Sequence, residues 1–496
     1  MATHSDFDVV EATIADIHAA YRSGLLSARQ LVALYLARIE AYDKNGPRIN
    51  AVLAVNPSAL DQADRLDAAQ KSAGFVGPLH GIPVIIKDQA DVKEMPTTLG
   101  SVLFKDYRPG RDCFVAAKLR QAGAILLGKG TLGELGAGDT HGSLFGSTRN
   151  PYDPTRTVGG SSGGPAASVS ANFTTVAVGQ EGLASIRRPS IWNGIAGMRP
   201  SIGLVSRGGV YGGWPSMAGS LGPMARTVTD LAKLLDAMVG YDPDDPATAH
   251  GVGRAPRSFA ERLDANALKD ARLGIMREPM GLNSEPGSDD FRKVATIFDR
   301  AVDELRQAGA EIVDPIVIPE LKPLLAKRAF STAEGDESFQ RYIAGTNAPF
   351  ASRQEAIASP LFERLLKPTR DRWLRAVPEE KHHASLWARD RLMTNMLKVM
   401  ADHRLDTIVH NAVEHQPTLI KDGINPPYTD QKGAPHINTF LESVPSIVVP
   451  AGFTSDNLPA GITFLGRPYT DAAMIRFAYA YEQATHHRKV PELTLK

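Results

Sequence analysis

The sequence predicts an α/β protein in which helices flank a mixed β-sheet. Along the 496 residues, short apolar runs of strand length alternate with segments whose apolar residues recur at helical spacing. A chain of this length can bury a sizeable core. The alternation of the two kinds of segment is typical of helices packed on the faces of a sheet.

Helices are predicted where capping residues precede an amphipathic pattern. Residues 27–42 begin with a capping box, in which Ser27 is followed three residues later by Gln30, and continue with apolar residues at helical spacing. Residues 289–308 place apolar side chains on one helical face, and Gly309 is expected to end that helix.

Strands are predicted at short apolar runs that end in glycine, proline or polar residues. One of these runs, HGIPVIIKDQ, leads directly into the charged residues Lys87 and Asp88. The predicted strands lie at residues 80–89, 123–131, 174–180, 310–318, 406–413, 446–453 and 460–466.

The charge balance argues against a nucleic-acid partner or an anionic membrane surface. Lys and Arg number 55 and Asp and Glu number 55, so the net charge is +0. The single cysteine, Cys113, leaves no internal disulfide and fits a reducing compartment. The first residues lack a secretory pattern, and the uncharged run 157–180 holds too much Gly, Ser, Thr and Pro to cross a bilayer. We therefore expect a cytoplasmic protein.

The stretch TVGGSSGGPAAS, residues 157–168, combines four glycines with small hydroxyl residues and no charge. Glycines allow close approach of another backbone segment and leave hydroxyls unshielded. A base for these hydroxyls is offered by Lys87, because burial would lower its pKa and make its neutral amine a proton acceptor. The alternative to a catalytic role is that Lys87, at the end of its strand, pairs with Asp88 or reaches solvent.

A further serine, Ser185, lies in the turn that follows the predicted strand at 174–180. We predict a relay in which Lys87 takes a proton from Ser161, Ser161 takes one from Ser185, and Ser185 attacks an acyl carbon. An oxyanion would be held by backbone N–H groups of the same turn. The predicted donors are Gly182, Leu183, Ala184 and Ser185.

Two other interpretations of the glycine-serine stretch compete with this relay. The sequence GSSGG also fits the G-x-S-x-G nucleophile elbow with Ser162 as nucleophile. That site would need a downstream acid and histidine, for which His436, His486 and His487 are available, but the apolar strand that precedes an elbow is missing. Phosphate binding is disfavoured because the Gly-Lys-Ser/Thr ending of the Walker pattern is absent.

The remaining polar candidates have structural interpretations. His410 and His415 are five residues apart and the chain has no HExxH, so we predict no metal site and interpret these histidines as ordinary surface or supporting groups. Cys113 is predicted on an apolar helix face, where cysteine usually acts as a small hydrophobe. We expect Asp88 and Glu181 to be structural partners instead of acids in the reaction. We expect Arg187 and Arg188 to anchor the turn, with substrate binding as the alternative.

Over almost its whole length the sequence resembles the amidase signature family. The motifs are GPLHGIPVIIKD, GSTRNPYDPTRTVGGSSGG, GQEGLASIRRPS, GIAGMRPSIGLVSRGGV, VPSIVVPAGF and PAGITFLGRP. The resemblance implies the amidase signature fold and a catalytic triad of Lys87, Ser161 in cis conformation and Ser185. In that triad Ser161 is the proton shuttle and Ser185 the nucleophile. The resemblance implies neither a metal nor an organic cofactor.

The turn before Ser185 departs from the pattern GTDxGGS that the resemblance leads us to expect. Gln180 replaces a threonine, Glu181 replaces an aspartate, and Leu183 and Ala184 replace glycines. Every one of these residues keeps its N–H group, so the oxyanion donors survive. The conformation of the turn would change if a glycine there required a positive φ.

The resemblance implies an amidohydrolase that cleaves a C–N bond through an acyl-enzyme on Ser185. The unusual turn and the less regular region 242–433 lead us to expect a small, apolar or aryl amide or carbamate (urethane) as the substrate. The alternatives are an amidotransferase-type subunit in a larger assembly, an esterase, and an inactive binding protein with the same fold. The expected partner is the small-molecule substrate, with neither nucleic acid nor a membrane. A homodimer is one expectation for the assembly.

We predict a single amidase domain over residues 1–496. It would comprise helices at 1–70, a catalytic core at 71–241, a variable region at 242–433 and the C-terminal part of the core at 434–496. Residues 242–433 are less regular, with many prolines and charges, and we expect them to shape the substrate pocket.

Overall fold

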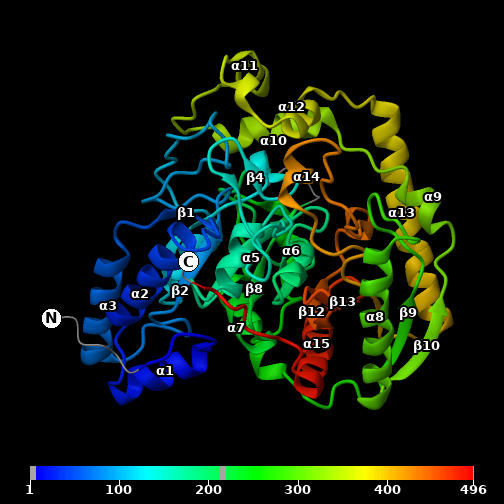
Figure 1. The fold of residues 1–496 in the computed structure, drawn as a ribbon, viewed down its shortest axis with the longest axis horizontal. Helices are drawn as coiled ribbons and strands as arrows, with labels where there is room; N and C mark the ends of the chain where they lie inside the picture. Colours follow the sequence, from blue (N-terminus) through cyan, green and yellow to red (C-terminus); the bar gives the residue numbers. More distant parts are fainter. Residues whose placement is uncertain (1–6, 213–218, 495–496) are drawn as a thin grey trace.

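A large mixed sheet runs through the molecule in the computed structural model, which describes residues 7–212 and 219–494 (Figure 1). Its 11 strands are β1 (Val52–Val55), β2 (Pro83–Lys87), β3 (Ile125–Gly130), β6 (Val176–Glu181), β7 (Ala196–Arg199), β8 (Ser220–Ala225), β9 (Arg272–Met276), β10 (Glu311–Ile316), β11 (Thr407–Asn411), β12 (Ser446–Phe453) and β13 (Pro459–Leu465). Two short strands, β4 (His141–Gly142) and β5 (Gly146–Ser147), pair separately.

The strand order is β1-β3-β2-β6-β8-β7-β12-β13-β11-β9-β10. Strands β3, β2 and β6 are parallel to one another, as are β11, β9 and β10, whereas the other neighbouring pairs are antiparallel. The predicted mixed α/β architecture is therefore confirmed.

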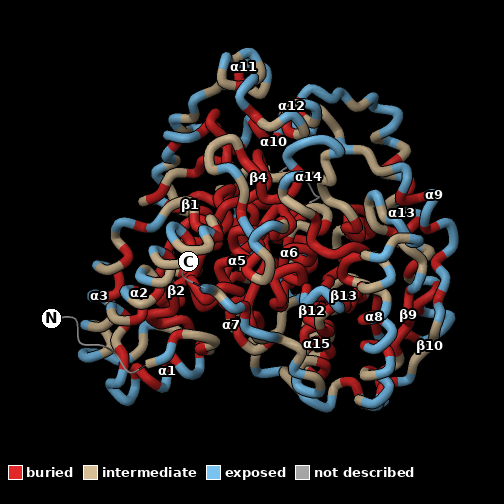
Figure 2. Tube along the Cα trace, in the orientation of Figure 1, coloured by how far each residue is buried: buried red, intermediate tan, exposed pale blue. Residues whose placement is uncertain are grey.

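Helices enclose the central strands, whose residues are buried without exception in β2, β3, β6, β7 and β8. Helices α4, α7 and α15 form one contiguous group, and α5 packs against α6 in another. Figure 2 shows that buried chain is concentrated around these strands and around α5 and α6. The helices are α1 (Ile14–Ser23), α2 (Ala28–Arg38), α3 (Ala59–Ala73), α4 (Phe114–Gln121), α5 (Gly163–Ser170), α6 (Arg187–Trp192), α7 (Val228–Met238), α8 (Asp289–Gln307), α9 (Leu321–Leu325), α10 (Thr332–Ile343), α11 (Arg353–Ala358), α12 (Lys367–Leu374), α13 (Glu379–Asp402), α14 (Ile420–Ile424) and α15 (Asp471–Thr485).

Each predicted strand segment overlaps one strand of the sheet, with bounds that differ by at most a few residues. The helix predicted at 289–308 is α8, and Gly309 follows it with a φ of +96°. The helix predicted at 27–42 is too long, because α2 ends at Arg38 and the chain continues as a π-helical turn. In that turn the buried Asp43 carboxylate accepts a hydrogen bond from the Ala51 N–H at 2.5 Å, which ties the turn to the start of β1.

The segment 242–433 contributes to the sheet and also covers one end of it. Strands β9, β10 and β11 extend the sheet at one edge. Helices α10, α11 and α12 lie at the top of Figure 1, where Phe339 packs edge-on against Phe104 with ring centres 6.3 Å apart. None of the helices in the described ranges is both long and apolar enough to cross a membrane. The proposed division into subregions remains a prediction.

The packing of α5 against the sheet gives a stability prediction at Gly164. A Cβ atom there would clash with the backbone N and O of Thr131, and both segments are buried. We expect Gly164→Ala to lower the free energy of unfolding by at least about 2 kcal/mol, because neither backbone can withdraw. Denaturant unfolding measures the change. The matched control is Gly287→Ala, where the added Cβ meets no atom within 4 Å. Equal stability of the two variants would contradict the packing argument.

Candidate active site

Lys87 is the last residue of β2 and its side chain is fully buried. Its Nζ lies 2.7 Å from Ser161 Oγ, 3.3 Å from the Gln180 carbonyl oxygen and 3.5 Å from Gln180 Oε1. Burial lowers the pKa of Lys87 well below its ordinary value, and the Glu181 carboxylate offsets part of that shift. A neutral amine has two N–H groups and a lone pair. The Gln180 oxygens can accept the N–H groups, which leaves the lone pair for Ser161.

The adjacent carboxylate of Asp88 does not neutralise Lys87. Successive side chains of a strand point to opposite faces, and Asp88 Oδ1 lies 3.1 Å from Lys129 Nζ in a fully buried ion pair. The Thr98 N–H donates to Asp88 Oδ2 at 3.0 Å. The alternative in which Lys87 pairs with Asp88 or reaches solvent is therefore wrong, and Asp88 has the structural role predicted for it.

Ser161 is buried, and the Gly160–Ser161 peptide bond is cis, the conformation that the family resemblance implies. Its hydroxyl faces Lys87 and can also donate to the Gly136 carbonyl oxygen at 2.8 Å. The Gly133 N–H donates to the Ser161 carbonyl oxygen at 3.0 Å. Ser161 is thus held between β2 and the short helical turn Glu134–Gly136, with its Oγ within reach of a base.

Close backbone contacts explain the small residues of 157–168. A Cβ at Gly160 would clash with the Asp139 backbone, and a Cβ at Gly163 would clash with the Thr140 side chain. The glycines are therefore required by packing against the segment that also carries the Gly136 carbonyl group.

Arg188 fixes the carbonyl group that precedes Ser161. Its Nη2 donates to the Gly160 carbonyl oxygen at 3.1 Å and also pairs with the buried Asp139 carboxylate. The guanidinium carbon lies 4.9 Å from the centre of the Trp192 ring. Burial raises the pKa of Asp139 to about 6, although Arg188 opposes the shift. We call the loop at residues 157–168, which carries Ser161, the serine loop. Arg188 is therefore a positioning residue for the serine loop, in agreement with the anchoring role predicted for it.

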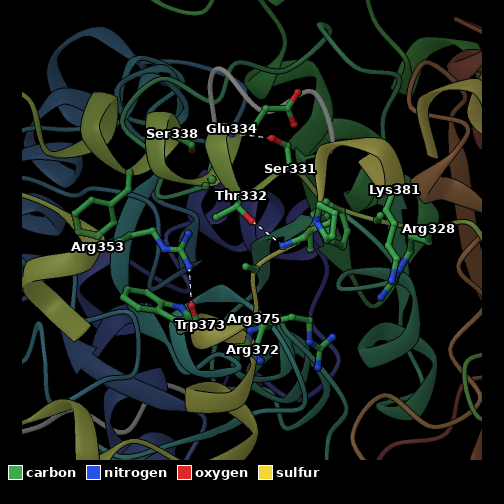
Figure 3. Close-up of a pocket in the computed structure, with 18 of the residues that line it drawn as sticks. Arg328, Ser331, Thr332, Glu334, Ser338, Arg353, Arg372, Trp373, Arg375 and Lys381 are labelled. Carbon is green, nitrogen blue, oxygen red and sulfur yellow. Dashed lines mark hydrogen bonds between the residues drawn. The ribbon is translucent and has the colours of Figure 1, made fainter. Parts of the chain in front are cut away.

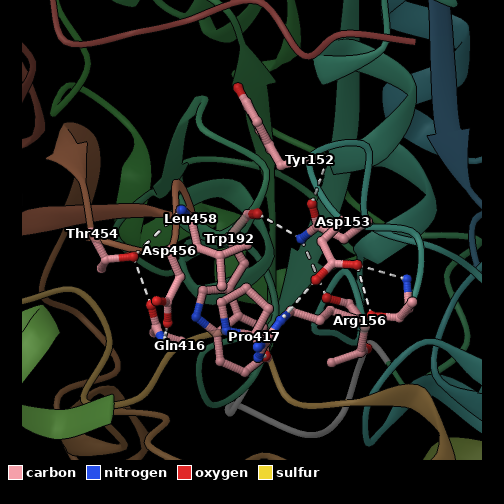
Figure 4. Close-up of polar contacts among 12 residues, drawn as sticks. Tyr152, Asp153, Arg156, Trp192, Gln416, Pro417, Thr454, Asp456 and Leu458 are labelled. Carbon is pink, nitrogen blue, oxygen red and sulfur yellow. Dashed lines mark hydrogen bonds and ion pairs between the residues drawn. The ribbon is translucent and has the colours of Figure 1, made fainter. Parts of the chain in front are cut away.

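The same region is tied to the chain that follows β11 (Figure 4). Trp192 Nε1 donates to the His415 carbonyl oxygen at 3.0 Å, and Arg156 Nη1 donates to the Pro417 carbonyl oxygen at 2.7 Å. The Thr157 N–H donates to the carbonyl oxygen of Thr418 at 2.9 Å. Segments more than 200 residues apart in the sequence are thus hydrogen-bonded to one another next to the loop that carries Ser161.

Ser185 lies in the turn between β6 and α6. The Ser162 N–H donates to the Ser185 carbonyl oxygen at 3.0 Å, so this turn runs beside the loop that carries Ser161. Ser185 is half-buried, and its hydroxyl makes no hydrogen bond with any residue of 7–212 or 219–494. The structure joins Lys87 and Ser161 directly. The transfer from Ser185 to Ser161 remains a prediction.

The turn before Ser185 presents unused backbone donors. Within the described chain, the N–H groups of residues 182–185 donate to no other residue. Arg187 Nη2 donates to the Leu183 carbonyl oxygen at 2.8 Å and so orients that peptide. Leu183 and Ala184 do not have positive φ angles, so the turn forms without glycine at either position. The assignment of Gly182, Leu183 and Ala184 to an oxyanion hole remains a prediction.

Glu181 holds the turn through its carboxylate. Its Oε2 accepts from the N–H groups of Ile186 and Arg187 at 2.8 and 2.9 Å, and its Oε1 accepts from Arg187 Nε at 2.7 Å. Both charged side chains are fully buried. The structural roles predicted for Glu181 and Arg187 are thus observed.

We expect Glu181→Gln to lower the free energy of unfolding by about 3–5 kcal/mol, because it leaves the buried Arg187 guanidinium without a counter-ion. Denaturant unfolding measures the loss. The control is Glu363→Gln, which breaks the more exposed ion pair with Arg370 and should cost less than about 1 kcal/mol. If Glu181→Gln lowers the free energy of unfolding no more than Glu363→Gln does, the Glu181 carboxylate does not hold the turn as described.

Two alternative nucleophiles are engaged in structural contacts. Ser162 is buried, and its Oγ accepts from the Gln180 N–H at 3.1 Å and donates to the Gln180 carbonyl oxygen at 3.0 Å. Cys113 does not lie on a helix face, because it is the N-cap of α4, and its Sγ accepts from the Ala116 N–H at 3.4 Å. Burial raises the pKa of Cys113 to about 12, which keeps the thiol protonated.

His410 and His415 do not lie on the surface, so that part of their interpretation as ordinary surface or supporting groups is wrong. His410 is buried because β11 is an interior strand of the sheet, and its Nδ1 lies 2.6 Å from the Asn411 carbonyl oxygen. His415 is also buried, with Nε2 3.0 Å from Asp290 Oδ2. In the described ranges, no three His, Cys, Asp or Glu side chains gather where they could hold a metal ion.

Two partners of the lysine and the serine were not predicted: the Gly136 carbonyl group and the Gln180 side chain. A carbonyl partner leaves no signature in a sequence, because every residue has one. Gln180 did carry a signal, since it is a polar residue near the carboxyl end of a strand parallel to β2, where ligand-binding groups of parallel strands gather.

Comparisons with known proteins agree with this architecture. The family described as Amidase matches residues 30–475. A probable amidase of Arabidopsis thaliana is 32% identical, over 98% of this chain and 93% of the relative. A glutamyl-tRNA(Gln) amidotransferase subunit of Methanosarcina barkeri is 31% identical, over 94% of this chain and 96% of the relative.

Solved structures give the same result. The peptide amidase of Stenotrophomonas maltophilia has a TM-score of 0.82 and 32% identity, over 97% of this chain and 99% of that one. A bacterial aryl acylamidase has a TM-score of 0.79 and 25% identity, over 96% of both chains. Fold and matches together define the class of protein as an amidohydrolase with the amidase signature fold. The chain belongs to the amidase family, and the resemblance found in the sequence is confirmed.

Proposed function

We propose that this amidase hydrolyses the C–N bond of small amides with an apolar or aryl body, including carbamates, through an acyl-enzyme on Ser185. The single observation that supports this most strongly is the 2.7 Å contact between Lys87 Nζ and Ser161 Oγ. A buried lysine with a lowered pKa can act as a base, and the hydroxyl beside it belongs to a loop in contact with Ser185.

In the acylation step, Ser185 Oγ attacks the carbonyl carbon while its proton passes to Ser161 Oγ, and the Ser161 proton passes to Lys87 Nζ. The tetrahedral oxyanion receives hydrogen bonds from N–H groups of residues 182–185. Collapse breaks the C–N bond, and the leaving nitrogen takes the proton back along the same route. The free amine and an ester of Ser185 result.

In the deacylation step, a water molecule attacks the ester carbonyl carbon, and its proton travels through Ser161 to Lys87. The second tetrahedral intermediate breaks its C–O bond to Ser185, whose Oγ recovers a proton. The products are the free acid and the original enzyme, so no external oxidant, reductant or cofactor is consumed.

The relay would also act on esters, because an acyl-serine route accepts an easier leaving group. An amidotransferase-type subunit is the second candidate, and the full-length match to the Methanosarcina barkeri protein favours keeping it. That candidate requires other subunits for its complete reaction, whereas a stand-alone hydrolase does not.

The test is hydrolysis by the purified chain alone of matched anilides, nitroanilides, carbamates, primary amides and esters, compared as kcat/KM. We expect turnover of aryl amides or carbamates with release of the free amine. Hydrolysis of esters only would assign the chain to the esterases. No turnover of any substrate would contradict the stand-alone proposal and favour the amidotransferase-type subunit.

A further inference from the structure

A cavity of about 600 Å³ lies among α10, α11, α12 and the segment around Tyr211 (Figure 3). Aromatic side chains form part of its wall, with Phe339 edge-on to both Tyr211 and Trp373. Its ionisable lining is strongly biased, because a single carboxylate, Glu334, is accompanied by five basic side chains. The basic residues are Arg328, Arg353, Arg372, Arg375 and Lys381.

One of these cations is neutralised within the protein and forms part of the wall. Arg353 Nη1 donates to Asp336 Oδ1 at 2.7 Å, and its guanidinium carbon lies 5.1 Å from the centre of the Trp373 ring. Figure 3 shows Arg353 beside Trp373, apart from Arg328 and Lys381. Arg353 therefore has a structural explanation and is not part of the inference.

The other three arginines make no ion pair with a carboxylate of the described residues, although the Asp430 and Glu134 carboxylates stabilise the charge of Arg372. Arg372 Nη2 donates to the Glu134 carbonyl oxygen at 2.8 Å, and Arg375 is exposed. Arg328 is partly buried, and its Nη1 is buried without a hydrogen-bond partner. We call Arg328, Arg372 and Arg375 the arginine trio.

Burial and the charge of Arg375 act against the protonated forms of Arg328 and Arg372. Burial and the nearby Arg375 lower the pKa of Arg328 to about 10. Burial also lowers the pKa of Arg372, while the Asp430 and Glu134 carboxylates oppose that shift and Arg375 adds to it. Charges that serve only solubility are usually separated or paired. Here a bound anion would counteract the repulsion between the guanidinium groups.

The cavity is connected to the catalytic loop by short links. Arg372 donates to the carbonyl group of Glu134, and Gly136, two residues further, accepts from Ser161 Oγ. On the other side, Gln89, two residues after Lys87, donates through Nε2 to the Tyr211 carbonyl oxygen at 2.8 Å. These contacts join the wall of the cavity to the segments that carry the relay, while Lys87, Ser161 and Ser185 do not themselves line it.

We propose that the substrate carries a carboxylate at a distance from the scissile amide, and that the arginine trio binds this carboxylate in the cavity. The inference rests on the proposed amidase function. Guanidinium groups bind planar oxyanions through paired N–H donors, and the aromatic wall provides contact for the apolar or aryl body. Amides of dicarboxylic acids and acylated aminobenzoates have this combination of groups.

The experiment measures binding by calorimetry to the Ser185→Ala protein, which does not require turnover. Two carboxylates are compared with their neutral isosteres: succinanilate with succinanilamide, and 4-(butyrylamino)benzoate with 4-(butyrylamino)benzamide. The pairs place the charge on the acyl side and on the amine side of the scissile bond, respectively. A third ligand, 3-phosphonopropionanilide, separates a carboxylate site from a phosphate site.

We expect at least one carboxylate to bind at least tenfold more tightly than its neutral isostere, and the preference to shrink as salt is raised. Arg328→Gln combined with Arg372→Gln should remove the preference. Arg375→Gln changes an exposed side chain that makes no hydrogen bond with the described residues, and it should reduce the preference for the carboxylate. This variant replaces the double variant in the test if the double variant does not fold. The control Arg65→Gln removes one positive charge from the exposed surface of α3, and it should leave the preference for the carboxylate unchanged.

Three results would overturn the inference: no preference in either pair, a preference that survives loss of the trio's charges, or tighter binding of the phosphonate alone. Failure of the enzyme to hydrolyse any amide would instead contradict the proposed function. The two failures are distinguishable because the calorimetric comparison uses a variant that lacks the nucleophile.

Discussion

Ser185→Ala should reduce kcat by at least about 10³-fold and abolish labelling of the intact protein by a fluorophosphonate probe. The loss of a serine nucleophile removes the covalent route entirely, and what remains comes from binding and the oxyanion donors. Because the Ser185 hydroxyl makes no hydrogen bond with the described residues, the substitution should leave the thermal unfolding of the protein nearly unchanged. Mass spectrometry of the labelled protein and amine release are the two measurements.

The matched control is Ser162→Ala, which removes the rival nucleophile of the GSSGG motif. Ser162 bridges the N–H and carbonyl groups of Gln180, so this variant should lose stability and still be labelled. Labelling that persists in Ser185→Ala and disappears in Ser162→Ala would transfer the nucleophile to Ser162. If both variants are still labelled, neither Ser185 nor Ser162 is the sole nucleophile.

Lys87→Met should lower kcat/KM by at least about 10²-fold, because general base catalysis contributes factors of about 10²–10⁴. The pH dependence identifies the mechanism. In the native enzyme, kcat/KM should fall as pH decreases through the lowered pKa of Lys87, where the amine becomes protonated. Lys87→Met should remove this acidic limb. A loss well below a hundredfold, or an unchanged acidic limb, would contradict the role of Lys87 as base.

The same substitution has an unusual expected effect on stability. Between the lowered pKa of Lys87 in the folded protein and the ordinary lysine pKa of about 10.4, the unfolded chain binds a proton that the folded chain does not. Stability therefore rises with pH across this window, so Lys87 is destabilising at neutral pH and Lys87→Met should not lower the unfolding temperature. The contrast is Lys129→Met, which leaves the buried Asp88 unpaired and should cost about 3–5 kcal/mol.

Some features of the fold follow from local sequence. The strand that carries Lys87 was predictable, because a short apolar run between glycine and charge has few other structures. Helix α8 was predictable from its apolar face and from Gly309. The continuation of residues 39–44 as a π-helical turn was not, since it depends on the contact between Asp43 and the start of β1.

The candidate site divides in the same way. The motifs around Lys87, Ser161 and Ser185 predicted which residues to combine, and the resemblance carried by those motifs identified the family. The partners of these residues could not be predicted, because the Gly136 carbonyl group and the Arg188 guanidinium reach the serine loop only after the chain has folded. The burial of His410 and His415 was missed for a related reason, since burial depends on which strands lie on either side of β11.

Local sequence was enough to predict the alternation of strands and helices, the family, and a lysine and two serines with compatible chemistry. The folded chain places Lys87 against Ser161 instead of Asp88. It also gathers Arg328, Arg372 and Arg375 around one cavity. Backbone periodicity and small-residue motifs are local, whereas a pKa, an ion pair and the charge of a cavity depend on groups that the fold brings together from distant parts of the chain.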